Sequence, residues 1–194
     1  MASNNACSEQ LRKQSSNDES LQIASWIEQA KAGDVQAFKQ IYERHIALVY
    51  GLCLRLCADK SQAEDATQEV FVQLWQKLDS FDGKSKFSTW LHAVASNVCI
   101  SYIRKQKGWW QKMFSIVDDQ NGTSMDKSDA GNFDADDLQA LIMKLPLRMR
   151  HVFVLHALEG YRHEQVAKML NISANTSKVQ FHRARGMLEE WVNE

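Results

Sequence analysis

Proline and glycine are scarce in this chain of 194 residues, which contains one proline and eight glycines. Folds rich in β-sheet need many tight turns, and those turns depend on these two residue types. Their scarcity therefore favours long helices. The chain also lacks any apolar run close to the ~20 residues that a membrane-spanning helix needs. Its polar start, "MASNNACSEQLRKQSSNDES", lacks the apolar middle of a signal peptide, so we expect a cytoplasmic protein with no membrane insertion.

Catalytic and metal-binding patterns are also missing. No CxxC pair supports zinc, the glycines never cluster into a phosphate loop, and no acid–base pair or nucleophile constellation stands out. We therefore expect no enzyme, no cofactor and no metal site. The net charge of −1 predicts no polyanion partner by itself, so the distribution of charge matters more than its sum.

Three of the four cysteines, Cys53, Cys57 and Cys99, lie within helical patterns. Intracellular cysteines of this kind are more often small buried hydrophobic residues, which is the simpler interpretation. Cys53 and Cys57 share a helix face, and His45 lies on an apolar stripe where a core-edge histidine is expected. Direct sensing of metal or redox state by Cys53, Cys57 and His45 stays open.

The first half of the chain has helical periodicity. A polar, disordered tail (1–18) precedes a helix that ends at Gly33, and Asp34 is expected to cap the next helix. Ser61 and Glu64 form a capping-box pattern at the start of a third helix. The apolar stripe predicted for the helix after Asp34 is Phe38, Tyr42, His45, Val49, Leu52 and Leu56, and that of the third is Ala66, Val70, Leu74 and Leu78.

The composition changes in the middle of the chain. The segment "QKMFSIVDDQNGTSMDKSDAGNFDADD" carries seven aspartates against two lysines and shows little periodicity, which is typical of an acidic linker. Four further helical patterns follow it. We therefore predict an all-α protein of two small helical domains joined by a flexible acidic linker. The predicted boundaries are a tail over 1–18, a first domain over 19–111, the linker over 112–135 and a second domain over 136–194.

The stretch "HEQVAKMLNISANTSKVQFHRARG" in the second domain is typical of a helix-turn-helix, with Ser173 able to cap its second helix. Residues 147–187 contain seven lysines and arginines against two glutamates, so this half is locally basic. A helix with amides and cations on its outer face suits the DNA major groove. The predicted inward positions are Ser177, Phe181, Ala184 and Leu188, and the outer ones are Asn175, Lys178, Val179, His182 and Arg183.

A second unusual stretch is "KSKFSTWLHAVASNVCISYIRKQKGWW". On a helix, one face of it must be core: Phe87, Leu91, Val94, Ala95, Val98 and Tyr102. Along its border lies a second stripe of Trp90, Asn97, Ser101 and Arg104. An aromatic surface, an amide and a cation in a row suit unpaired bases, with lysines for phosphates. The plainer alternative is that Trp90 only packs and the lysines only keep the surface soluble.

Together these pieces resemble a known family. "AEDATQEVFVQLWQKLDSFDGKSKFSTWLHAVASNVCISYIRK" resembles region 2 of the extracytoplasmic-function (ECF) sigma factors of bacterial RNA polymerase, and "LPLRMRHVFVLHALEGYRHEQVAKMLNISANTSKVQFHRARGML" resembles their region 4. The resemblance covers nearly the whole chain from residue 19 onward, in the family's order. It implies binding to core RNA polymerase and promoter DNA, promoter melting, and control by an anti-sigma factor.

The resemblance also implies three sets of site residues. Core polymerase binding is assigned to Asp65, Gln68 and Glu69. Capture of the melted −10 strand is assigned to Lys86, Phe87, Trp90, Asn97, Ser101, Tyr102 and Arg104. Reading of the −35 element is assigned to Asn175, Thr176, Lys178, Val179, His182, Arg183 and Arg185.

Two positions depart from the family's pattern. Ser177 stands where an aliphatic residue is usual, and Gln180 where an arginine is frequent, which puts one phosphate contact in doubt. An alternative function is a helix-turn-helix regulator that binds duplex DNA without polymerase. That alternative leaves the Trp90 stripe and the acidic linker unexplained.

Overall fold

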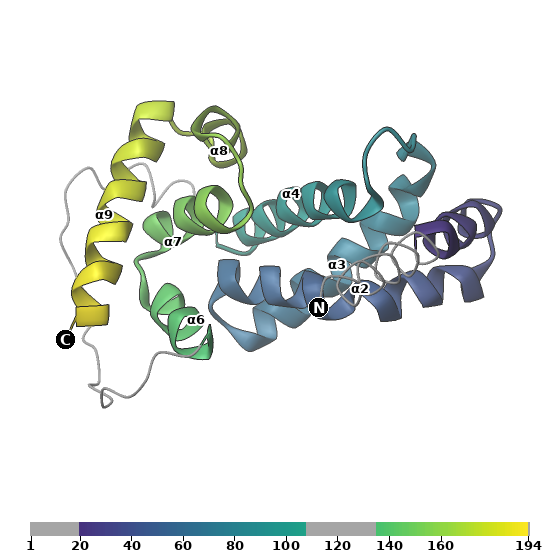
Figure 1. The fold of residues 1–194 in the computed structure, drawn as a ribbon, viewed down its shortest axis with the longest axis horizontal. Helices are drawn as coiled ribbons and strands as arrows, with labels where there is room; N and C mark the ends of the chain where they lie inside the picture. The colour runs from purple at the N-terminus through teal and green to yellow at the C-terminus, as the bar shows by residue number, and fades with distance from the viewer. Residues whose placement is uncertain (1–19, 108–134, 194) are drawn as a thin grey trace, which may run out of the picture.

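The computed structural model describes residues 20–107 and 135–193, and every regular element in these two ranges is helical (Figure 1). The predicted tail and nearly all of the predicted linker lie outside the described residues. The predicted all-α fold is confirmed. None of the described helices is long and apolar enough to cross a membrane.

The first unit contains a helix over 20–31, α2 (Val35–Cys57), α3 (Lys60–Lys77), the short 3-10 turn η1 (Leu78–Ser80) and α4 (Phe87–Lys107). Helices α2 and α4 run side by side and both pack on α3 (Figure 1). The expected apolar stripe of α3 is buried throughout. In α2 the buried face includes Ala37 and Ile41, and it leaves Tyr42 at the edge, where its ring centroid lies 4.6 Å from that of Phe71.

The connections of this unit follow from local backbone chemistry. Gly33 has φ +94°, a left-handed conformation that glycine adopts without steric cost, and it ends the first helix as predicted. The predicted cap is confirmed, because Asp34 Oδ1 accepts hydrogen bonds from the backbone of Gln36 and Ala37.

The capping box predicted at Ser61 was wrong. Helix α3 begins at Lys60, so Ser61 already lies in its first turn. The N-cap is Asp59, whose Oδ1 accepts a hydrogen bond from the backbone N–H of Gln62 at 2.8 Å. A capping side chain must precede the first helical residue, and Asp59 has the extended backbone that this position requires.

The second unit contains α6 (Ala135–Lys144), α7 (Leu147–Phe153), the π-helical turn η2 (Val154–Leu158), α8 (His163–Leu170) and α9 (Ala174–Asn193). Helices α8 and α9 form the predicted helix-turn-helix. Asn171 has φ 53° in the turn between them, and Ser173 Oγ accepts a hydrogen bond from the backbone of Thr176, as a cap for α9.

The inward face of α9 is confirmed at Ser177, Ala184 and Leu188, which are buried, and Phe181 is half-buried. The unusual Ser177 has a structural explanation. Its hydroxyl lies 2.9 Å from Nδ1 of His163 on α8, so the buried polar group is hydrogen-bonded. The pair ties the two helices of the motif together where an aliphatic contact would otherwise do so.

We expect Asp59→Ala to lower the free energy of unfolding by about 1 kcal/mol, the usual cost of a lost N-cap. Ser61→Ala is the matched control and should change it much less, because Ser61 lies inside the first turn. Urea unfolding followed by circular dichroism measures both. Equal losses for the two variants would contradict the assignment of the cap to Asp59.

Candidate functional site

The outer face of α9 is an exposed polar surface. Helix α9 starts directly after the tight turn, so the side chains of its first two turns project from the end of the motif. Arg185 is also engaged locally, since its Nε lies 2.6 Å from Glu189 Oε1. The residues predicted for this face are all exposed: Asn175, Thr176, Lys178, Val179, His182, Arg183 and Arg185.

Gln180 does not belong to this outer face. It is half-buried and lines a cavity of about 150 Å³ between α7, the turn and α9. Arg148 of α7 and Thr176 line the same cavity. The Arg148 side chain of α7 therefore lines the same cavity as Gln180, the position where the family frequently has an arginine.

The outer face of α3 carries the polar residues predicted to bind core polymerase and also exposed apolar residues. Asp65 and Gln68 are exposed and Glu69 is half-buried. Sequence reasoning missed the exposed apolar side chains beside them, Val72 (54% exposed) and Trp75 (38% exposed). Exposed apolar groups next to charged ones are typical of protein-binding surfaces. Both residues fall outside the core stripe of α3, which is the signal that could have identified them.

The predicted stripe on α4 is only partly open. Phe87 is buried, and Trp90 is half-buried, its ring centroid 5.2 Å from that of Phe81 and 5.8 Å from that of Phe87. Trp90 therefore belongs to an aromatic cluster and presents only part of its ring to solvent. Lys86 is exposed ahead of the helix.

Farther along α4 the polar side chains have intramolecular partners. The amide of Asn97 is exposed, and it donates to the backbone carbonyl of Ala93 at 2.8 Å. Ser101 is half-buried. The half-buried Tyr102 donates its hydroxyl to Asp65 Oδ2 of α3 at 3.2 Å, so two of the predicted surfaces touch each other at this point.

Arg104, at the end of the same stripe, contacts the second unit. Its guanidinium donates to the backbone carbonyl of Met169 on α8, and burial lowers its pKa. A side chain predicted to contact a DNA strand is therefore held by the helix-turn-helix unit. Nothing in the sequence pattern indicated this contact.

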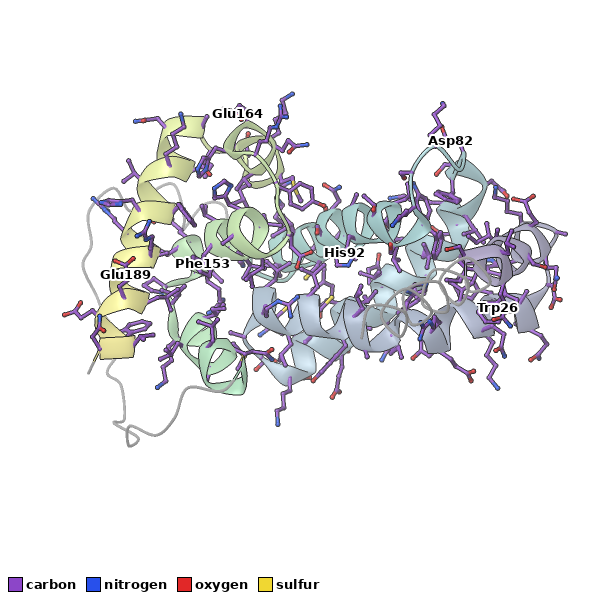
Figure 2. The ribbon with its side chains drawn as sticks, in the orientation of Figure 1. Trp26, Asp82, His92, Phe153, Glu164 and Glu189 are labelled. Atoms are coloured by element: carbon purple, nitrogen blue, oxygen red, sulfur yellow. The ribbon has the colours of Figure 1, made fainter. Side chains whose placement is uncertain are left out.

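Glu159, directly after η2, makes the principal charged contact between the units. Its carboxylate is almost fully buried and lies 3.2 Å from Nη2 of Arg55 on α2 and 2.7 Å from Nδ1 of His92 on α4. Figure 2 shows His92 in the middle of the molecule, where the two units meet. Burial alone would raise the pKa of Glu159, but the hydrogen bonds and charges of His92 and Arg55 outweigh it and lower the pKa.

Helix α7 closes the end of α2. The guanidinium of the buried Arg150 donates to the carbonyl of Cys57 at 3.4 Å, and the ring of His151 donates from Nε2 to the carbonyl of Leu56 at 3.1 Å. These are carbonyls of the last turn of α2, which have no partner within their own helix. Burial lowers the pKa of Arg150 to about 10, so this cation stays charged at neutral pH.

His45 occupies the core edge, as the simpler interpretation predicted. It is 8% exposed, and its ring centroid lies 5.4 Å from that of Phe87. Burial, together with the charges of Arg44 and His92, lowers its pKa, which favours the neutral ring. Within residues 20–107 and 135–193, no three His, Cys, Asp or Glu side chains are arranged to hold a metal ion.

Known protein families match the chain in two places. The family described as Sigma-70 region 2 matches residues 41–108, and the one described as Sigma-70, region 4 matches residues 135–188. The chain is 31% identical to the ECF RNA polymerase sigma factor SigW of Bacillus subtilis over 184 residues, which cover 90% of this chain and 98% of that protein. It is 26% identical to the ECF RNA polymerase sigma-E factor of Haemophilus influenzae, over 88% of this chain and 95% of the relative.

A solved structure has the same fold. It is the sigma factor RpoE from Bartonella quintana, crystallised in complex with the anti-sigma factor NepR. It superposes with a TM-score of 0.52 at 24% identity, over 82% of this chain and 98% of that one.

We expect Glu159→Gln to weaken the contact between the units by about 1–3 kcal/mol, because the neutral amide loses the charge that pairs with Arg55 and His92. Glu164→Gln on the exposed side of α8 is the control. X-ray scattering should show a larger radius of gyration for the first variant only. Equal radii for both variants would contradict a role of Glu159 in holding the units together.

Acid should weaken the contact between the two units, as Glu159→Gln does. A carboxyl whose pKa is lowered by folding stabilises the folded form above its ordinary pKa, here 4.5, and loses that contribution as the pH falls through the lowered value. Scattering profiles of the unaltered chain should therefore expand when the pH falls below that range. Glu159→Gln should already be expanded at neutral pH and should respond less to acid.

Proposed function

We propose a division of labour between the two helical units of this chain. The chain belongs to the ECF family of RNA polymerase sigma factors, and the proposal follows from that membership. The first unit, residues 19–111, binds core polymerase and the melted −10 strand. The second unit, residues 136–194, reads the −35 element. The observation that carries this proposal is the exposed polar face of α9 behind a region 2-like bundle, in the order in which the family carries these two regions.

On α9 the two kinds of contact are separated along the helix. Asn175 and Thr176 lie next to the turn, where short polar side chains reach base edges in the major groove. Lys178 and Arg183 lie farther along and suit phosphates. Val179 is exposed between them, and an apolar side chain at such a position suits the methyl group of thymine.

Capture of the −10 strand requires the two units to separate. Arg104 is engaged with α8, and the aromatic surface around Trp90 is partly covered by its own cluster. We infer that the described arrangement is a closed form. When the second unit moves away to reach the −35 element, it releases Arg104 for the strand.

Polymerase binding is assigned to the outer face of α3. Asp65, Gln68 and Glu69 supply polar contacts, and we add Val72 and Trp75 as the apolar part of the same surface. A mixed surface of this kind buries apolar area on binding and orients the partner through its charges.

In this proposal the chain catalyses no reaction of its own and acts in the cytoplasm, where the polymerase synthesises RNA. The relative from Bartonella quintana was crystallised with an anti-sigma factor, and we propose a partner of that class here. A stand-alone helix-turn-helix regulator is not favoured, because the match to region 2 extends through α2, α3 and α4.

The salt dependence of DNA binding distinguishes the base contacts of α9 from its phosphate contacts. Each lost phosphate contact reduces the slope of log affinity against log salt by about 0.9. Lys178→Ala and Arg183→Ala should therefore flatten this slope on a selected −35 duplex and keep the sequence preference. Asn175→Ala should relax the preference at one or two base pairs with the slope nearly intact. The reverse pattern would exchange the two roles.

The α3 surface can be tested by charge reversal. Asp65→Lys with Glu69→Lys should weaken binding to core polymerase at least tenfold, while circular dichroism stays unchanged. Glu43→Lys on the exposed side of α2 is an acidic control on another helix and should bind normally. Equal affinity of all three proteins in a fluorescence titration would remove polymerase binding from α3.

A further inference from the structure

Three cysteine side chains gather between α2 and α4. Cys53, Cys57 and Cys99 are all free thiols and all buried, and Cys57, at 8% exposed, is the most accessible of them. The Sγ atoms of Cys57 and Cys99 are 4.0 Å apart. Cys53 also interacts with Cys99 through a hydrogen bond between their thiols. A disulfide has an S–S length of about 2.05 Å, so a movement of about 2 Å would join Cys57 to Cys99.

The second unit packs on the end of α2, where Cys57 lies. Cys57 is the last residue of α2, and its carbonyl accepts the guanidinium of Arg150, while the preceding carbonyl accepts the ring of His151. Both covering residues come from α7. The interface around them combines apolar side chains, such as Leu56 and Val152, with the buried Glu159 carboxylate. Interfaces of this kind between units allow relative movement, and such a movement would expose the end of α2 to solvent.

The surroundings also suit oxidation once the site is open. Opening gives a peroxide access to the Cys57 thiol, and the thiolate is the form of cysteine that reacts with peroxides. The hydrogen bonds that Cys99 makes with Cys53 and Cys57 raise the pKa of Cys99 and keep its proton in place. The cluster thus contains one thiol at the end of α2, which opening exposes, and a second thiol 4.0 Å from it that can react with the oxidised sulfur.

We propose that Cys57 and Cys99 form an oxidation site for hydroperoxides that the second unit shields in the closed form. The Cys57 thiolate attacks a peroxide, the O–O bond breaks and a sulfenic acid forms, while the leaving oxygen takes up the proton that the thiol had lost to solvent and departs as water or an alcohol. Cys99 then attacks the Cys57 sulfur, the S–S bond forms, and the hydroxyl leaves as water with the proton of Cys99. Two thiols are oxidised and one hydroperoxide is reduced. The product links the end of α2 covalently to the middle of α4.

The site is independent of promoter and polymerase binding, so it can be tested on the chain alone. The full-length protein with Cys7→Ser removes the fourth cysteine from the chemistry. It is treated with hydrogen peroxide at neutral pH, the remaining thiols are alkylated, and the cross-linked peptides are quantified by mass spectrometry. We expect the Cys57–Cys99 peptide to be the dominant disulfide.

Shielding is tested by adding Glu159→Gln, with Glu164→Gln as the matched control. When opening is fast, the rate of modification follows the population of the open form. Since 1.4 kcal/mol corresponds to tenfold, the first variant should form the disulfide about tenfold faster than the parent, and the control should match the parent. Equal rates in all three proteins would overturn the shielding.

Substitutions identify the pair. Cys53→Ser should still form the Cys57–Cys99 disulfide. In Cys57→Ser the remaining Cys53 could pair with Cys99, and we expect this disulfide to form much more slowly. Should either serine variant lose its helical circular dichroism, the alanine variant replaces it. A dominant Cys53–Cys99 link would overturn the assignment, and so would the absence of any disulfide in a protein whose thiols oxidise readily after unfolding in guanidinium.

Discussion

The two-unit arrangement depends on one buried carboxylate. Glu159 is held between Arg55 of α2 and His92 of α4, so a single side chain from the second unit contacts two helices of the first. A buried carboxylate without partners would be costly, and its pKa is lowered only because both cationic groups face it. When the units separate, water replaces these contacts for all three groups. The contact therefore specifies a geometry without making separation prohibitive.

The ability of the two units to separate affects the predicted DNA-binding stripe of α4. Arg104 donates to the carbonyl of Met169 in the closed form, and under the proposed function it contacts a DNA phosphate in the open form. Each state offers the guanidinium an acceptor, so the two states compete for this residue. The competition between the Met169 carbonyl and DNA for Arg104 affects which form is populated. In the closed form, Arg104 is not available to bind DNA.

The sequence predicted the elements and most of the faces well, because these depend on local periodicity and capping. The exposed side of α9, the buried stripe of α3 and the cap at Asp34 follow from residues that are close in sequence. The cap of α3 was missed because two possible acceptors, Asp59 and Ser61, lie on either side of Lys60, and only the identity of the first helical residue distinguishes them. The exposure of Val72 and Trp75 was not predicted, because an apolar residue beside a core stripe can pack against a neighbouring helix or face solvent, and only the packed helices decide which.

What no periodicity could provide was the contact between the units. Arg55 and Glu159 are separated by 104 positions and Arg104 and Met169 by 65, and each of these residues also fits its own helix or turn without the other. The burial of Arg150 and His151 could not be predicted from periodicity either. An arginine and a histidine on a short amphipathic helix predict a solvated face. Both are buried instead, since the end of α2 presents carbonyls that need donors. The orphan carbonyls of one helix thus select donor side chains of another, and this complementarity exists only after both units have folded.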